Sequence, residues 1–215
     1  MRRRLILSTP FHKCHHNDIY QRGKVYVYDG SSSGLSATPN WTATSDRFSV
    51  PEFGFSVASA GDVNGDGYKD IINGAPLYSN GQTAEGVALI SHGSSTGLTP
   101  NPGSPSNAAR LLEKDQAGAS FGYAVASAGD INDDGYSDVI VGAPKYDNGE
   151  TDEGAVFVYN GSAGENVKYF LHGGIIIGAP GEASGGLTGR GEVIVWAQSA
   201  FEYFTDVSCY GIFFV

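Results

Sequence analysis

Long apolar runs, cysteine and positive charge are all scarce in this sequence of 215 residues. No apolar stretch approaches the roughly 18 residues that suggest a membrane-spanning helix. Two cysteines, Cys14 and Cys209, are too few for a disulfide framework, and they could form one bridge or remain free thiols. The formal net charge of −10 argues against nucleic acid as a partner. We therefore expect no transmembrane segment in this chain and no nucleic-acid partner.

Signals for export and for catalysis are also missing. The basic start, Arg2 to Arg4, precedes only three apolar residues, which is too short for the core of a signal peptide, so we expect none here. The motifs of serine hydrolases, of zinc proteases and of phosphate-binding glycine loops do not occur. These absences predict a chain that is not an enzyme.

What the sequence does contain is a long internal repeat. Residues 53–76 read FGFSVASAGDVNGDGYKDIINGAP, and residues 121–144 read FGYAVASAGDINDDGYSDVIVGAP, at an offset of 68. Partial copies flank this pair: LILSTP from Leu5, RGKVYVYDGSSSGL from Arg22, GGIIIGAPG from Gly173 and RGEVIVWAQSA from Arg190. Repeats of this length point to an architecture of stacked, equivalent units.

The repeat contains four runs with the alternation and the β-branched content of strands. In the first full copy we expect strands at 53–59, 70–74, 87–91 and about 108–112, with equivalents at 121–127, 138–142, 155–159 and 41–44. Four strands in 68 residues, with 31 glycines in the chain for tight turns, predict a four-stranded antiparallel blade. The predicted fold class is all-β, a partial β-propeller. A β-sandwich of duplicated hairpins is the alternative, but it does not explain the fixed spacing.

The repeat also divides the chain. The expected segments are the C-terminal half of a blade with a linker at 1–52, a full repeat at 53–120, the start of a second repeat at 121–165, a truncated half-repeat at 166–197 and an unassigned tail at 198–215. Between Gly142 and Gly178 the spacing is 36 residues instead of 68, so the third repeat is shortened. The chain could be a fragment, or the product of a deletion or a shifted reading frame.

The ordered elements Phe-Gly, Asp-x-Asn-x-Asp-Gly-x-x-Asp and Gly-Ala-Pro, which occur twice, resemble the FG-GAP repeats of integrin α-subunits over about residues 1–197. The resemblance implies an extracellular or cell-surface module for adhesion or ligand binding, with a protein or an extracellular-matrix-type ligand. An accessory propeller of a secreted enzyme, such as a phospholipase D-type protein, is the alternative. About three blade equivalents are fewer than the roughly 4–8 of closed propellers, so self-association through open blade faces is possible.

The Asp-rich segments predict two calcium loops. The first places Asp62, Asn64, Asp66, Tyr68 and Asp70 at positions 1, 3, 5, 7 and 9, and the second places Asp130, Asn132, Asp134, Tyr136 and Asp138 at the same positions. Calcium prefers several hard oxygen ligands, and the tyrosines can offer their backbone carbonyls. Gly67 and Gly135 permit the sharp bend at position 6. Position 9 supplies the closing carboxylate if the loops follow the FG-GAP pattern.

An Asx-rich turn without metal is the alternative for each loop. Because the loops lie a full repeat apart, we expect each of them to bind its ion independently of the other.

Two further features have simpler interpretations. His12, Cys14, His15 and His16 have metal-ligand chemistry, but the repeat places them in a loop whose other copies lack such residues, so we expect a solvated loop. Phe53-Gly54 and its copy at 121–122 are expected to pack between blades, with the glycine allowing close backbone approach.

Overall fold

The computed structural model describes residues 4–9, 23–47, 52–163, 176–179 and 192–195. Every regular element in these ranges is a β-strand. None of the described residues belongs to a helix with the length and apolar character needed to cross a membrane. The chain divides into two compact units, 1–170 and 171–215.

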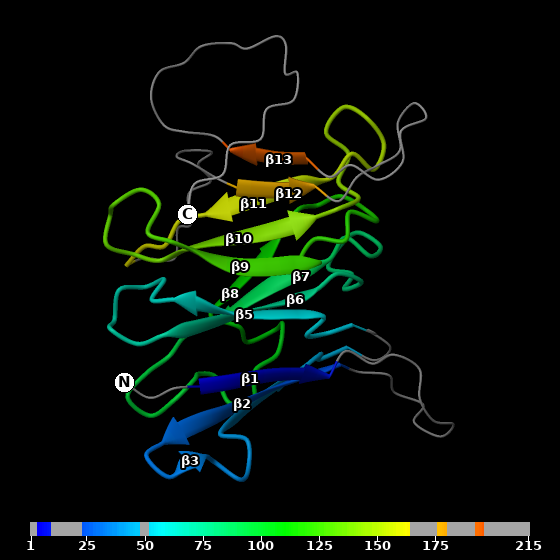
Figure 1. The fold of residues 1–215 in the computed structure, drawn as a ribbon. Helices are drawn as coiled ribbons and strands as arrows, with labels where there is room; N and C mark the ends of the chain where they lie inside the picture. Colours follow the sequence, from blue (N-terminus) through cyan, green and yellow to red (C-terminus); the bar gives the residue numbers. More distant parts are fainter. Residues whose placement is uncertain (1–3, 10–22, 48–51, 164–175, 180–191, 196–215) are drawn as a thin grey trace. The chain divides into compact units, whose positions relative to one another are not determined.

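The first sheet of the larger unit is built around one long strand (Figure 1). Its strands are β1 (Arg4–Thr9), β2 (Lys24–Ser31), β3 (Gly34–Leu35) and β4 (Trp41–Thr44). β2 pairs antiparallel with each of the other three. Trp41 lies in the core with its indole Nε1–H donating to the carbonyl oxygen of Pro100 at 2.6 Å, which links this sheet to a loop of the next repeat.

The second sheet confirms the predicted four-stranded antiparallel unit. It contains β5 (Ser56–Gly61), β6 (Asp70–Ala75), β7 (Val87–Ser91) and β8 (Arg110–Glu113), in that order. All residues of β6 and β7 are buried, as expected for the two central strands of a sheet that is covered on both faces.

The third sheet repeats this arrangement with three strands in its described part. It contains β9 (Ala124–Gly129), β10 (Asp138–Ala143) and β11 (Ala155–Tyr159), in the order β11-β10-β9. The register is the same as in the second sheet, because Ser56 pairs with Gly74 and Ala124 pairs with Gly142. The smaller unit contributes one antiparallel hairpin of β12 (Ile176–Ala179) and β13 (Glu192–Val195).

The Phe-Gly dipeptide differs from the prediction, since it lies in a turn and β5 begins three residues later than expected. Gly54 has a φ of 76°, and the Phe55 N–H donates to the Glu52 carbonyl oxygen at 2.9 Å, which closes the turn. The offset of 68 holds here too, because β9 likewise starts at Ala124 instead of at Phe121.

The packing role of these phenylalanines is confirmed. Phe53 is fully buried in a core cluster that contains Trp41 of the first sheet and Leu89 of the second. Phe121 is fully buried in another cluster, which joins the second and third sheets. The Phe121 N–H also donates to the Glu85 carbonyl oxygen at 2.8 Å. Each phenylalanine therefore fixes one sheet against the preceding one.

Candidate metal centres

Each Asp-rich loop connects the first two strands of its sheet. The first loop follows β5, and Asp70 at its position 9 is already the first residue of β6. The second loop follows β9 and ends in the same way on Asp138, the first residue of β10. Gly67 and Gly135 at position 6 have φ values of 86° and 89°, the left-handed conformation that glycine permits most readily. The predicted bend at this position is thus present in both loops.

The side chains of the first loop turn inward and accept hydrogen bonds from its own backbone. The Asp66 N–H donates to Asp62 Oδ1 at 3.0 Å and to Asn64 Oδ1 at 3.1 Å, so both oxygens face the same point. The Gly67 N–H donates to Asp62 Oδ2 at 2.8 Å, and the Tyr68 N–H donates to Asp66 Oδ1 at 2.9 Å. The loop thereby gathers carboxylate and amide oxygens on its inner side.

The second loop repeats this pattern bond for bond. The Asp134 N–H donates to Asp130 Oδ1 at 3.0 Å and to Asn132 Oδ1 at 3.2 Å. The Gly135 N–H donates to Asp130 Oδ2 at 2.8 Å, and the Tyr136 N–H donates to Asp134 Oδ1 at 3.0 Å. Two loops with different neighbours therefore adopt one geometry, which their shared sequence pattern determines.

The carboxylates at position 9 lie beneath the loops and are fully buried. Asp70 accepts the N–H groups of Val63 and Gly93, each at 2.8 Å. Asp138 accepts those of Ile131 and Gly161 at the same distance. Burial raises the pKa of both carboxyls, and their backbone hydrogen bonds oppose that rise. The charges of nearby loop carboxylates raise the pKa further, so each loop concentrates negative charge that a cation would relieve.

The oxygen set of each loop fits calcium. No three His, Cys, Asp or Glu side chains in the described residues lie close enough to hold an ion by themselves. A site therefore also needs the Asn oxygen at position 3 and the backbone carbonyl at position 7, and calcium accepts such a mixture of carboxylate, amide and carbonyl oxygens. Asp66 and Asp134 are exposed, so an ion and its waters can reach the loops from solvent.

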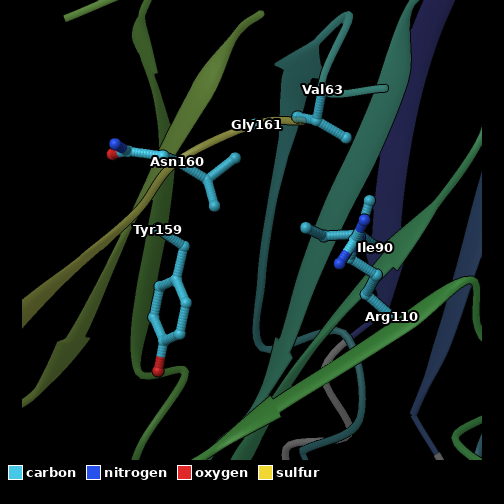
Figure 2. A pocket seen from close by; sticks show the side chains of 7 residues that line it. Val63, Ile90, Arg110, Tyr159, Asn160 and Gly161 are labelled. Carbon is cyan, nitrogen blue, oxygen red and sulfur yellow. The ribbon is translucent and has the colours of Figure 1, made fainter. Parts of the chain in front are cut away.

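The two loops, which the sequence places a full repeat apart, are in direct contact. The Ser137 N–H of the second loop donates to the Asp62 carbonyl oxygen of the first loop at 2.8 Å. The Ser162 N–H donates to the Val63 carbonyl oxygen, also at 2.8 Å. Figure 2 shows Val63 beside Gly161, and both residues line a cavity of about 10 Å³, which is space for one water molecule. The third sheet thus holds the backbone of the first loop.

Two backbone groups that bind the position-9 carboxylates were not predicted. The N–H groups of Gly93 and Gly161, each 23 residues after the carboxylate it binds, complete the position-9 environment. The sequence did contain a signal, because the two glycines stand 68 residues apart in the repeat, each at the second residue after the third strand. The cluster at 12–16 lies outside the described residues, as does Cys209.

Comparison with known proteins adds to this geometry. A family model described as the FG-GAP repeat matches residues 53–90 and 121–159, which contain both loops and the strands that flank them. This chain carries FG-GAP repeats. The two antiparallel sheets that contain the FG-GAP matches are therefore blades of the β-propeller type.

The chain is similar to integrin α-subunits of several animals. It is 36% identical to "Integrin alpha-IIb" of Mus musculus over 123 residues, which cover 56% of this chain and 11% of that protein. It is 40% identical to "Integrin alpha-6" of Homo sapiens over 117 residues, which cover 54% and 9%. It is 39% identical to "Integrin alpha pat-2" of Caenorhabditis elegans over 153 residues, which cover 68% and 12%. The chain thus spans about a tenth of the length of these relatives.

Proposed function

We propose that this chain is a calcium-binding, non-catalytic propeller module that serves adhesion or ligand binding outside the cell. The observation that carries the proposal is the identical inward-facing hydrogen-bond pattern of the two loops. An Asx turn needs one or two such contacts, whereas each loop here orders two carboxylates and one amide around a single bend. The likeness to integrin α-subunits supports the adhesion role.

Each proposed ligand has a defined task. The position-1 and position-5 carboxylates supply charge, the position-3 amide supplies a neutral oxygen, and the position-7 tyrosine supplies its backbone carbonyl. The buried position-9 carboxylate closes the site from below. The proposed ligands of the first ion are Asp62, Asn64, Asp66, Tyr68 and Asp70, and those of the second ion are Asp130, Asn132, Asp134, Tyr136 and Asp138. Calcium supplies the positive charge that joins these oxygens.

Several broader features belong to the same proposal. Loops of this kind suit the millimolar calcium outside cells, where modules bind with dissociation constants of about 10⁻⁴–10⁻³ M. We propose a protein or extracellular-matrix-type ligand. We also propose the repeat boundaries at 53–120 and 121–165, and association with further blades or copies through open blade faces.

We expect Asp66→Ala and Asp134→Ala each to lower the bound calcium from two ions per chain to one. Each substitution removes a charged ligand at the centre of one loop and leaves the other loop's ligands intact. Titration calorimetry gives the stoichiometry. Asp133→Gly is the matched control, because it removes a carboxylate from the second loop at a position that binds no ion in this scheme and copies the residue at the same place in the first loop. Loss of an ion in this control would contradict the ligand assignment.

Ligand binding should depend on calcium. We expect the purified chain to bind at least one protein of an extracellular-matrix panel in millimolar calcium. With chelator its affinity for that protein should fall by about tenfold, which lies within the usual range of coupling between two sites. The reason is that the loops order the turns of neighbouring blades. Biolayer interferometry measures this, with the Asp66→Ala/Asp134→Ala double variant as the control. A folded, calcium-loaded chain that binds no member of the panel would argue against the adhesion role and leave the metal assignment in place.

A further inference from the structure

The second loop touches the first through a peptide unit that has two tasks. The Ser137 N–H bonds the Asp62 carbonyl oxygen of the first loop. The same peptide unit carries the Tyr136 carbonyl, the proposed position-7 ligand of the second ion. One rigid plane therefore connects the second ion to the residue that opens the first loop.

Side-chain packing strengthens this connection. A Cβ atom at Gly65, position 4 of the first loop, would lie 2.5 Å from Cε1 of the Tyr136 ring. A Cβ at Gly61 would lie 2.4 Å from Cβ of Ser137. Both glycines therefore make room for the second loop. At the position equivalent to Gly61, a Cβ on Gly129 meets no described atom within 4 Å.

The equivalent residues of the second loop show that backbone conformation alone does not require glycine at position 4. Asp133 occupies that position with a φ of 56°, close to the 72° of Gly65. Aspartate tolerates this left-handed conformation. The neighbouring tyrosine ring therefore explains the glycine at 65. Through this contact the second loop supports the first.

We propose that the second loop is a positioning element for the first, so that calcium in the second loop raises the calcium affinity of the first. This inference rests on the proposed calcium binding. An ion held by the Tyr136 carbonyl would polarise the shared peptide and strengthen its N–H bond to Asp62. It would also fix the Tyr136 ring against Gly65, so that the first loop would be partly ordered before its own ion arrives. Couplings of this kind are typically about 5–150-fold, and we expect the lower end, about fivefold.

The test follows each site separately in a calcium titration by NMR, using the amide resonances of Gly67 and Gly135. We expect the first-loop dissociation constant to be about fivefold weaker in Asp134→Ala, which has no second ion, than in the unaltered chain. Tyr136→Ala keeps the carbonyl ligand and removes only the ring. It should lower the calcium affinity of the first loop more than that of the second loop, to which Tyr136 belongs. Linkage requires a reciprocal change. Asp66→Ala should lower the calcium affinity of the second loop by the same factor by which Asp134→Ala lowers the calcium affinity of the first loop.

The matched control is Tyr68→Ala, the equivalent substitution in the first loop, which should leave the second-loop affinity unchanged. A first-loop dissociation constant that is the same in the unaltered chain, Asp134→Ala and Tyr136→Ala would overturn the coupling and leave calcium binding intact. If neither glycine amide responds to calcium, both the coupling and the proposed metal sites are wrong. Asp134→Ala keeps the Tyr136 ring and the Ser137 N–H, although it removes the Asp134 Oδ1 acceptor of the Tyr136 N–H. The test therefore does not depend on the folding of Tyr136→Ala alone.

Discussion

Replacing Gly74 by alanine should destabilise the chain by about 3 kcal/mol or more, because the new methyl group has no space. A Cβ at this position would lie 1.8 Å from the carbonyl oxygen of Gly122 and 2.5 Å from Oγ of Ser56. The first of these atoms belongs to the backbone of the next repeat, so no rotamer change can relieve the clash. Ser56 Oγ also donates to that carbonyl at 2.8 Å, and the two repeats would have to separate at this point.

Gly142 is the control for this prediction, since it occupies the same place 68 residues later. A Cβ there would have Ala124 Cβ as its nearest described neighbour at 3.6 Å, an ordinary contact. Glycine within a strand costs about 0.5–1 kcal/mol relative to alanine, so Gly142→Ala should leave stability unchanged or raise it slightly. Urea unfolding of both variants gives the comparison. Equal stability of the two variants would show that the close approach at Gly74 does not hold the repeats together.

Much of the fold could be predicted because the repeated sequence pattern identifies equivalent strands at a fixed offset. The strands at 87–91 and 155–159 were predicted with their observed bounds, since each apolar, β-branched run directly follows a glycine that every copy shares. The start of β5 was not predicted correctly. Phe53 looks like the first residue of an apolar strand, but Gly54 adopts a positive φ and closes a turn before the strand begins. A single glycine thus shifts the boundary by three residues.

The contact between the loops could not be predicted from one repeat at a time. Ser137 and Asp62 are 75 residues apart, and neither residue type indicates a partner. The difference between Gly65 and Asp133 was visible in the aligned repeats. The physical reason for this difference is the Tyr136 ring, which lies against Gly65. A single repeat does not reveal this contact, because a glycine in a turn usually reflects backbone conformation.

The second large effect is stabilisation by calcium. The folded loops hold their oxygens on one side, whereas the unfolded chain has no such arrangement, so we expect calcium to bind the folded form selectively. Each site then adds about 2.7 kcal/mol at a calcium concentration a hundred times its dissociation constant, and two sites add about 5 kcal/mol. Two ions also change the net charge from −10 to −6 and remove repulsion among the carboxylates.

The Asp66→Ala/Asp134→Ala double variant is the control for this effect. It keeps the fold but lacks the central carboxylate of both loops, so calcium should stabilise it by less than about 1 kcal/mol. Magnesium at the same concentration should stabilise the unaltered chain less than calcium does, because magnesium prefers to retain its waters.

Equilibrium unfolding in urea, with excess chelator and then in calcium at a hundredfold excess over the measured dissociation constants, tests the central claim most directly. The claim is that two FG-GAP loops of this chain are calcium sites. We predict a rise of about 5 kcal/mol in the free energy of unfolding of the unaltered chain, with almost no change in the double variant. The same unfolding midpoint with chelator and with calcium would contradict the claim and leave the loops as metal-free turns.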